Sequence, residues 1–237
     1  MIPLCISYPG SGETWIRTIL SSLGVDLEYT HHHASLSKEH WGLHFFDLRP
    51  FTSDRDKIIF LHRDPRDTTL SFFHQITNQI ALSAFDSAVY ALSGKLPPND
   101  LDAFVRRPRF GIEKTATFNR NCAHTLRGKY WVTYEALTEN THDEIARLLE
   151  YLGEWRSVGE IMDAIVTSRV QSILAQQGAN DARFDPKALT DSTNQLHPNW
   201  NEAGKDKVGR YLVEMKRNTI SYCDEVLSKI GYFTTVS

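Results

Sequence analysis

The sequence predicts an α/β fold in which a central parallel sheet is flanked by helices. Short apolar runs alternate along the chain with segments whose apolar residues recur at helical spacing, which is typical of strands joined by helical crossovers. The 237 residues, of which 41% are hydrophobic, are enough to bury one sizeable core. We therefore expect a single domain over residues 1–237.

The first strand and helix of this pattern surround a glycine-rich turn. An apolar run over residues 3–8 predicts the strand, and the turn at residues 9–12 ends it. Apolar residues then recur every three or four positions until Gly24, which predicts a helix. The beginning of the chain is therefore expected to be strand, turn and helix.

Two further strands repeat the unit. Residues 57–62 form a continuous apolar run of the buried parallel type, and a helix is expected to begin near Asp67 after the break at residues 64–65. Residues 130–134 predict a third strand, and residues 145–152 line one face of the helix after it. Strands and helices thus alternate over most of the chain.

The remaining segments are expected to cover the sheet. Residues 67–127 are mostly helical by pattern, with breaks at residues 94–99 and around Pro108. Residues 177–204 are polar and rich in turn residues, so we predict a mobile or acceptor-site loop there. The spacing of apolar residues over 208–226 predicts one long closing helix.

Composition restricts the function. The formal charge of −3 gives no reason to expect nucleic acid as a partner. Three cysteines, far apart in the sequence, form no disulfide framework or zinc motif. The chain has no signal-like start and no run of 18 apolar residues, which predicts a cytoplasmic protein without a membrane anchor.

The first turn has the chemistry of an anion site. It joins a buried strand to a helix N-terminus, where backbone N–H groups and the helix dipole favour phosphate or sulfate. It lacks the Gly-Lys-Ser/Thr ending of a Walker A loop, so generic hydrolysis of ATP or GTP is disfavoured. Taken alone, the turn is equally compatible with a purely structural role.

A second candidate follows the second strand. Arg63 leaves the carboxyl end of that strand, where ligands bind in open α/β sheets, and Ser71 falls on the next helix. A guanidinium and a hydroxyl together suit a phosphate. The alternative is a surface cluster of aspartate and arginine that caps the helix.

Together, the two segments resemble the signatures of the sulfotransferase family that uses 3′-phosphoadenosine 5′-phosphosulfate (PAPS). These are Tyr-Pro-Lys/Arg-Ser-Gly-x-Thr-Trp and Arg-x-Pro-x-Asp-x-x-x-Ser. The resemblance implies a P-loop-like sulfotransferase fold, with Arg63 and Ser71 at the 3′-phosphate of the donor. It also implies that the first loop binds the 5′ side and the adenine through Ser11, Gly12, Glu13, Thr14 and Trp15.

Further segments are similar to the family in the same order. Residues 133–137 look like its Tyr-Glu-Asp-Leu segment, which implies that Tyr134 reaches the adenine. Thr167 matches a Thr-Ser-Phe segment near the base, although Arg169 replaces the phenylalanine. Lys205 and Lys207 match a divergent form of the loop that closes over the 3′-phosphate.

The largest departure from the family is in the first loop. The family's cation there, which neutralises charge on the bridging oxygen as sulfuryl leaves, is replaced by Gly10. Arg17, one turn into the helix and directed back toward its N-terminus, is our candidate replacement.

The predicted general base is a histidine between the two loops. The family carries Lys-Thr-His or Thr-His-Asp in this interval, and Thr30-His31 is the nearest match, so His31 is the first candidate. His32 and His33 follow, because an alignment shift of one residue exchanges them. A solvated loop or a metal site is the alternative, but consecutive residues do not present ligands on one face.

The predicted reaction is sulfuryl transfer from PAPS to a hydroxyl or amine of a small-molecule or glycan acceptor, without a metal. A basic run, Arg106-Arg107-Pro108-Arg109, attracts an anionic acceptor or is a solvated surface. Two other functions stay open: a sulfonucleotide-binding protein that has lost turnover, and a nucleotide-dependent kinase. The acceptor and the oligomeric state are not specified by any motif.

Overall fold

A computed structural model describes residues 2–31, 57–78, 100–108, 111–125, 129–176 and 208–232 of the chain. Within these ranges a four-stranded sheet has the order β2-β1-β3-β4, and every neighbouring pair is parallel. The strands are β1 (Leu4–Ser7), β2 (Glu28–His31), β3 (Ile58–His62) and β4 (Tyr130–Thr133).

The register brings the carboxyl ends of all four strands to one edge of the sheet. Ser7 of β1 lies opposite His31 of β2 and Leu61 of β3, and His62 lies opposite Thr133 of β4. β1 and β3 are buried along their whole length, as expected for central strands covered on both faces. Loops that follow these strands are therefore neighbours in space.

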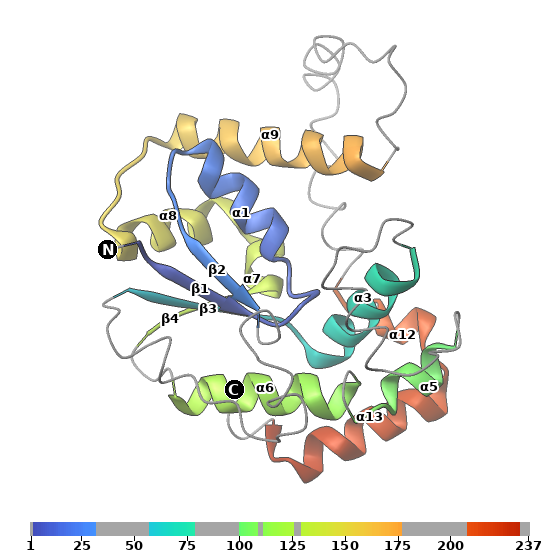
Figure 1. The fold of residues 1–237 in the computed structure, drawn as a ribbon. Coiled ribbons are helices and arrows are strands. Elements are labelled where there is room, and N and C mark those ends of the chain that lie inside the picture. Colours follow the sequence, from blue (N-terminus) through green and yellow to red (C-terminus); the bar gives the residue numbers. More distant parts are fainter. Residues whose placement is uncertain are drawn as a thin grey trace.

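Helices cover both faces of this sheet (Figure 1). On one face lie α1 (Glu13–Ser22), α8 (Thr141–Leu152) and α9 (Val158–Gln176), which pack on strand residues such as Cys5 and Ile59. On the other face, α6 (Ile112–Thr125) and α3 (Pro65–Asn78) pack on strand residues such as Ile6 and Phe60. Successive strand residues thus alternate between two cores.

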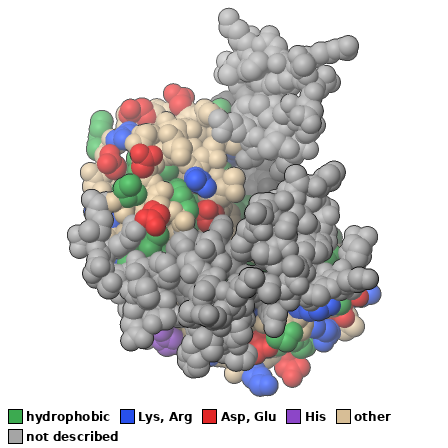
Figure 2. All heavy atoms as spheres, viewed as in Figure 1, with side chains coloured by type: hydrophobic (Ala, Val, Ile, Leu, Met, Phe, Trp, Pro, Cys, Tyr) green, Lys and Arg blue, Asp and Glu red, His purple; other side chains and the backbone are tan. Residues whose placement is uncertain are grey.

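The remaining helices extend the second face. They are α5 (Leu101–Val105), α12 (Tyr211–Glu214) and α13 (Arg217–Lys229), and they form a third apolar cluster with α3 and α6. The short helix α7 (Tyr134–Glu139) follows β4 directly. On the described part of the face in Figure 2, acidic, basic and apolar side chains are interspersed, in keeping with the small formal charge of −3.

Four elements differ from the sequence prediction. The helix expected near Asp67 begins at Pro65, where proline has the backbone geometry of a first helical turn. The prediction of a single closing helix was wrong. The chain is extended at Met215 and Lys216, between α12 and α13, and the Met215 side chain is buried there. The strand β2 and the long helix α9 were not predicted.

Two predicted segments fall outside the described residues: the break at 94–99 and the loop at 177–204. Across the ranges that are described, no helix is both long and apolar enough to cross a membrane.

Candidate functional site

The loop between β1 and α1 has the geometry of an anion site. Gly12 is the N-cap of α1 with a left-handed backbone, and as a glycine it has no side chain to cap this helix end. The Ser11 hydroxyl is buried, and its oxygen has no hydrogen-bond partner within the described part of the chain. A helix N-terminus and a buried hydroxyl next to it are together suited to bind phosphate or sulfate oxygens.

Both glycines of this loop are required by close packing as well as by their positive φ angles, 87° at Gly10 and 98° at Gly12. A Cβ atom at Gly10 would lie 2.9 Å from the carbonyl oxygen of Thr68 and 3.2 Å from Cβ of Ser71, both on α3. A Cβ atom at Gly12 would lie 2.4 Å from the ring of Tyr134. The loop is thus pressed between α3 and α7, and position 10 has no room for the family's cationic side chain.

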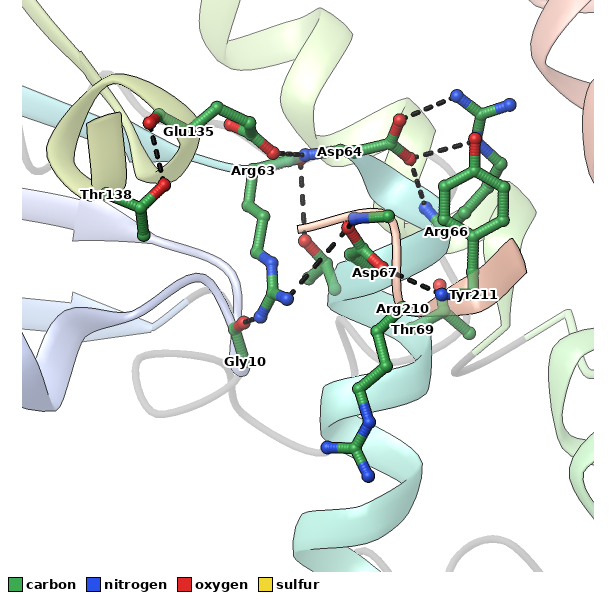
Figure 3. A network of polar contacts seen from close by, with 12 residues as sticks. Gly10, Arg63, Asp64, Arg66, Asp67, Thr69, Glu135, Thr138, Arg210 and Tyr211 are labelled. Atoms are coloured by element: carbon green, nitrogen blue, oxygen red, sulfur yellow. Dashed lines mark hydrogen bonds and ion pairs between the residues drawn. The ribbon is translucent and has the colours of Figure 1, made fainter. Parts of the chain in front are cut away.

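Arg63 connects three segments around the loop (Figure 3). It follows β3, its residue is only 4% exposed, and its guanidinium donates to the carbonyl of Gly10 at 3.2 Å. The same group lies 4.3 Å from the ring centroid of Tyr134 and 4.0 Å from a carboxylate oxygen of Asp67. A buried cation is therefore fixed directly beside the glycine-rich loop.

An aromatic pair borders the same loop. The rings of Trp15 on α1 and Tyr134 on α7 meet edge to face, with centroids 5.9 Å apart. Tyr134 is held at the start of α7 because the Thr133 hydroxyl accepts a hydrogen bond from the Ala136 N–H at 3.0 Å. Burial raises the pKa of Tyr134, which keeps its hydroxyl protonated.

The acidic and basic residues after Arg63 form a surface cluster, which was the alternative interpretation of this segment of the sequence. Arg63 itself lies in a different environment. Arg66 pairs with Asp64 at 2.6 Å and with Asp224 of α13 at 2.8 Å, and its guanidinium lies over the ring of Tyr211. The cluster therefore ties α13 to the start of α3, while Arg63 faces the loop.

Two contributors were missed from the sequence. The carboxylate of Asp67 accepts hydrogen bonds from the N–H groups of Gly209 at 2.6 Å and Tyr211 at 3.1 Å. Glu135 accepts from the N–H of Asp64 at 2.9 Å. The four-residue spacing of Arg63 and Asp67, across the junction between β3 and α3, is a signal that could have indicated their pairing.

The other predicted donor-site residues lie on α1, α3 and α9. Ser71 lies beside Gly10 on α3. Glu13 begins α1, and its carboxylate accepts a hydrogen bond from the Ser7 hydroxyl at 2.8 Å. Thr14 is exposed on the first turn of α1, and Thr167 is exposed on α9.

The predicted catalytic residues lie on the β2 side of α1. Arg17 is exposed, and its guanidinium lies 5.1 Å from the ring centroid of Tyr29 on β2. His31 ends β2 and lies opposite Ser7 in the register. The His31 side chain, together with all of His32, His33, Lys205, Lys207 and Arg109, lies outside what is described.

One buried histidine adjoins the site. The ring of His62 is stacked on Phe60 and meets Trp131 edge to face, with centroids 5.3 and 5.7 Å away. Burial lowers the pKa of His62 to about 4, so the imidazole is neutral near pH 7. Its surroundings are those of a core residue on the α6 face rather than of a base exposed to an acceptor.

Comparisons with known proteins agree with this architecture. Residues 36–229 match a family model described as "Sulfotransferase domain". The crystal structure of mouse sulfotransferase SULT7A1 complexed with PAP matches with a TM-score of 0.60 and 14% sequence identity, over 96% of this chain and 83% of that one. This match confirms the predicted fold class, whereas among curated proteins none matches the chain. The family match begins after the glycine-rich loop.

Proposed function

This chain belongs to the sulfotransferase domain family, as the match over residues 36–229 establishes, and from that premise we propose that it transfers a sulfuryl group from PAPS to an acceptor hydroxyl or amine. The family match confirms the resemblance to sulfotransferases that the two sequence motifs indicated. The acceptor class, a small molecule or a glycan, and the cytoplasmic location stay predictions.

The observation that carries the proposal is the contact between Arg63 and the glycine-rich loop. A guanidinium 3.2 Å from the Gly10 carbonyl places a cation next to the helix N-terminus and the buried Ser11 hydroxyl. A donor with phosphate groups at both its 5′ and 3′ positions suits two adjacent anion sites of this kind. The mouse sulfotransferase of similar fold was crystallised with PAP, which supports the same assignment.

The residues fit the donor as follows. The N-terminus of α1, with Ser11, Gly12, Glu13 and Thr14, would face the 5′ side. Arg63 and Ser71 would bind the 3′-phosphate, and Trp15 and Tyr134 offer aromatic surface to the base. Thr167, Lys205 and Lys207 stay predicted contacts.

Transfer would break the bond between sulfur and the bridging phosphate oxygen and form a bond between sulfur and the acceptor atom. The acceptor's proton would pass to His31, which lies at the end of β2 beside the end of β1. The departing phosphate oxygen gains negative charge, which the N-terminus of α1 would stabilise. The scheme needs no metal ion.

Arg17 is the proposed source of additional positive charge. Its guanidinium lies over Tyr29, two residues before His31, so the cation and the proposed base share one side of α1. Because a side chain at position 10 would collide with α3, the cation has to come from elsewhere in the chain. A sulfonucleotide-binding protein without turnover is the second candidate, and the same crowding at Gly10 favours it.

Sulfuryl transfer tests the proposal directly. Purified protein would be incubated with sulfur-labelled PAPS and a panel of phenols, alcohols, amines and oligosaccharides, and labelled product would be separated by chromatography. We expect transfer to at least one class, with turnover reduced at least about a hundredfold in His31→Ala and about tenfold in Arg17→Ala. Tight donor binding without transfer across the panel would favour the protein without turnover.

A further inference from the structure

Asp67 lies between the cation of the candidate donor site and the beginning of the C-terminal helices. One carboxylate oxygen is 4.0 Å from the Arg63 guanidinium and also accepts from the Gly209 N–H at 2.6 Å. The other oxygen accepts from the Tyr211 N–H at 3.1 Å. The residue is 1% exposed, so water contributes little to its solvation.

This arrangement satisfies the charge of a buried carboxylate while leaving the arginine directed at the loop. Buried carboxylates require hydrogen bonds or counterions, and Asp67 has both. Arg63 contacts Asp67 on one side and the Gly10 carbonyl on the other, as Figure 3 shows. The carboxylate therefore restrains Arg63 and the turn at residues 208–211 at the same time.

We propose that Asp67 is a positioning residue that gives the donor site its selectivity for a 3′-phosphate, by linking the Arg63 guanidinium to the 208–211 turn. The inference rests on the proposed function, because it assumes that Arg63 binds this phosphate. Asp67 itself does not contact the donor. A site with Arg63 unrestrained loses the preorganisation on which tight binding of an anion depends.

The chain offers a matched control for this role. Asp224 also ties the C-terminal helices to the start of α3, but it is half exposed and its ion pair, at 2.8 Å, is with Arg66 rather than Arg63. Asp67→Asn and Asp224→Asn therefore each weaken one link between the same two parts of the molecule. Only the first changes the surroundings of Arg63.

Selectivity is measured by titrating the full-length protein with 3′-phosphoadenosine 5′-phosphate (PAP) and with adenosine 5′-monophosphate (AMP), which lacks the 3′-phosphate. In Asp67→Asn we expect PAP affinity to fall on the order of tenfold with AMP affinity nearly unchanged. In Asp224→Asn the ratio of the two affinities should equal that of the wild type. A purely structural role for Asp67 would weaken both ligands equally.

A second measurement needs no variant and applies if Asp67→Asn fails to fold. Because coupling between two equilibria is reciprocal, a ligand whose binding depends on the Asp67 contacts must stabilise those contacts by the same factor. Saturating PAP should therefore slow hydrogen exchange at the amides of Gly209 and Tyr211 on the order of tenfold. AMP should leave their exchange unchanged.

The outcomes separate this inference from the function on which it rests. If the wild type prefers PAP while Asp67→Asn keeps the full preference, or if PAP leaves the two amides unprotected, the role of Asp67 is refuted and the donor site stands. If the wild type shows no preference for PAP over AMP, the proposed donor is wrong and the role of Asp67 is refuted with it.

Discussion

Restoring the family's cation in the first loop is expected to damage this protein rather than to improve it. Gly10→Lys places a Cβ atom 2.9 Å from the Thr68 carbonyl oxygen and 3.1 Å from the Phe72 nitrogen, both backbone atoms of α3 that cannot turn away. The φ angle of 87° adds a cost of roughly 1–2 kcal/mol for any residue with a side chain. Overpacking adds about 1–3 kcal/mol, so we expect a loss of about 2–5 kcal/mol.

Two alanine variants separate these contributions. Gly10→Ala has the same Cβ atom without the charge, and should be destabilised by nearly as much as Gly10→Lys. Gly24 also has a positive φ angle, 71°, but a Cβ atom there would meet nothing within 4 Å, so Gly24→Ala should cost only the backbone penalty, roughly 1–2 kcal/mol. The free energy of unfolding is measured by urea denaturation monitored through tryptophan fluorescence.

A Gly10→Lys protein with wild-type stability and higher sulfuryl-transfer turnover would refute the reasoning. It would mean that α3 gives way to admit a side chain at position 10. Equal destabilisation of Gly10→Ala and Gly24→Ala would also contradict it, because the steric contribution of α3 would then be absent.

Three more predictions follow from single side chains. Arg63→Lys keeps the charge but loses the planar fork, so PAP affinity measured by calorimetry should fall at least about tenfold, and an unchanged affinity would contradict the role of Arg63. The pKa of His62 is lowered from 6.5 to about 4 by burial, so the unfolded state takes up the proton first as pH falls. Stability present above pH 6.5 is therefore lost between 6.5 and 4, about 2 kcal/mol of it between pH 7 and pH 5, as measured by urea denaturation. His62→Leu should lack this part of the pH dependence, and an unaltered dependence would exclude His62 as its source. Thr133→Val keeps the shape of the side chain but removes the cap of α7, so the same assay should show a loss of about 1 kcal/mol, and no loss would mean that the cap is dispensable.

The two central strands could be predicted because all their side chains have one uniform environment. β1 and β3 are buried throughout, so each is a continuous apolar run in the sequence. β2 is four residues long at the edge of the sheet and mixes charged and aromatic residues, so it has no such pattern. α9 buries Ile161 and Ile165 while exposing Val158 and Met162, which obscures the helical period.

The candidate site was predictable where local sequence determines the chemistry. The glycine-rich loop and the segment from Arg63 to Ser71 each carry their pattern within a few residues, and the parallel sheet brings them together. The link from Asp67 to Gly209 was not predictable, because backbone N–H groups 142 positions away leave no mark in the sequence. The same holds for the extended break at Met215, since its apolar side chain fits the helical spacing and only tertiary packing places it.

Calorimetric titration of the wild-type protein with PAP tests the central claim most directly, with ADP as a control that lacks the 3′-phosphate, and with and without magnesium. The account predicts micromolar binding of PAP that does not depend on magnesium, and much weaker binding of ADP. Equal or stronger binding of ADP, or a requirement for magnesium, would contradict a sulfonucleotide site and favour a kinase. Absence of binding by either ligand would contradict the assignment of Arg63 and the glycine-rich loop to a donor.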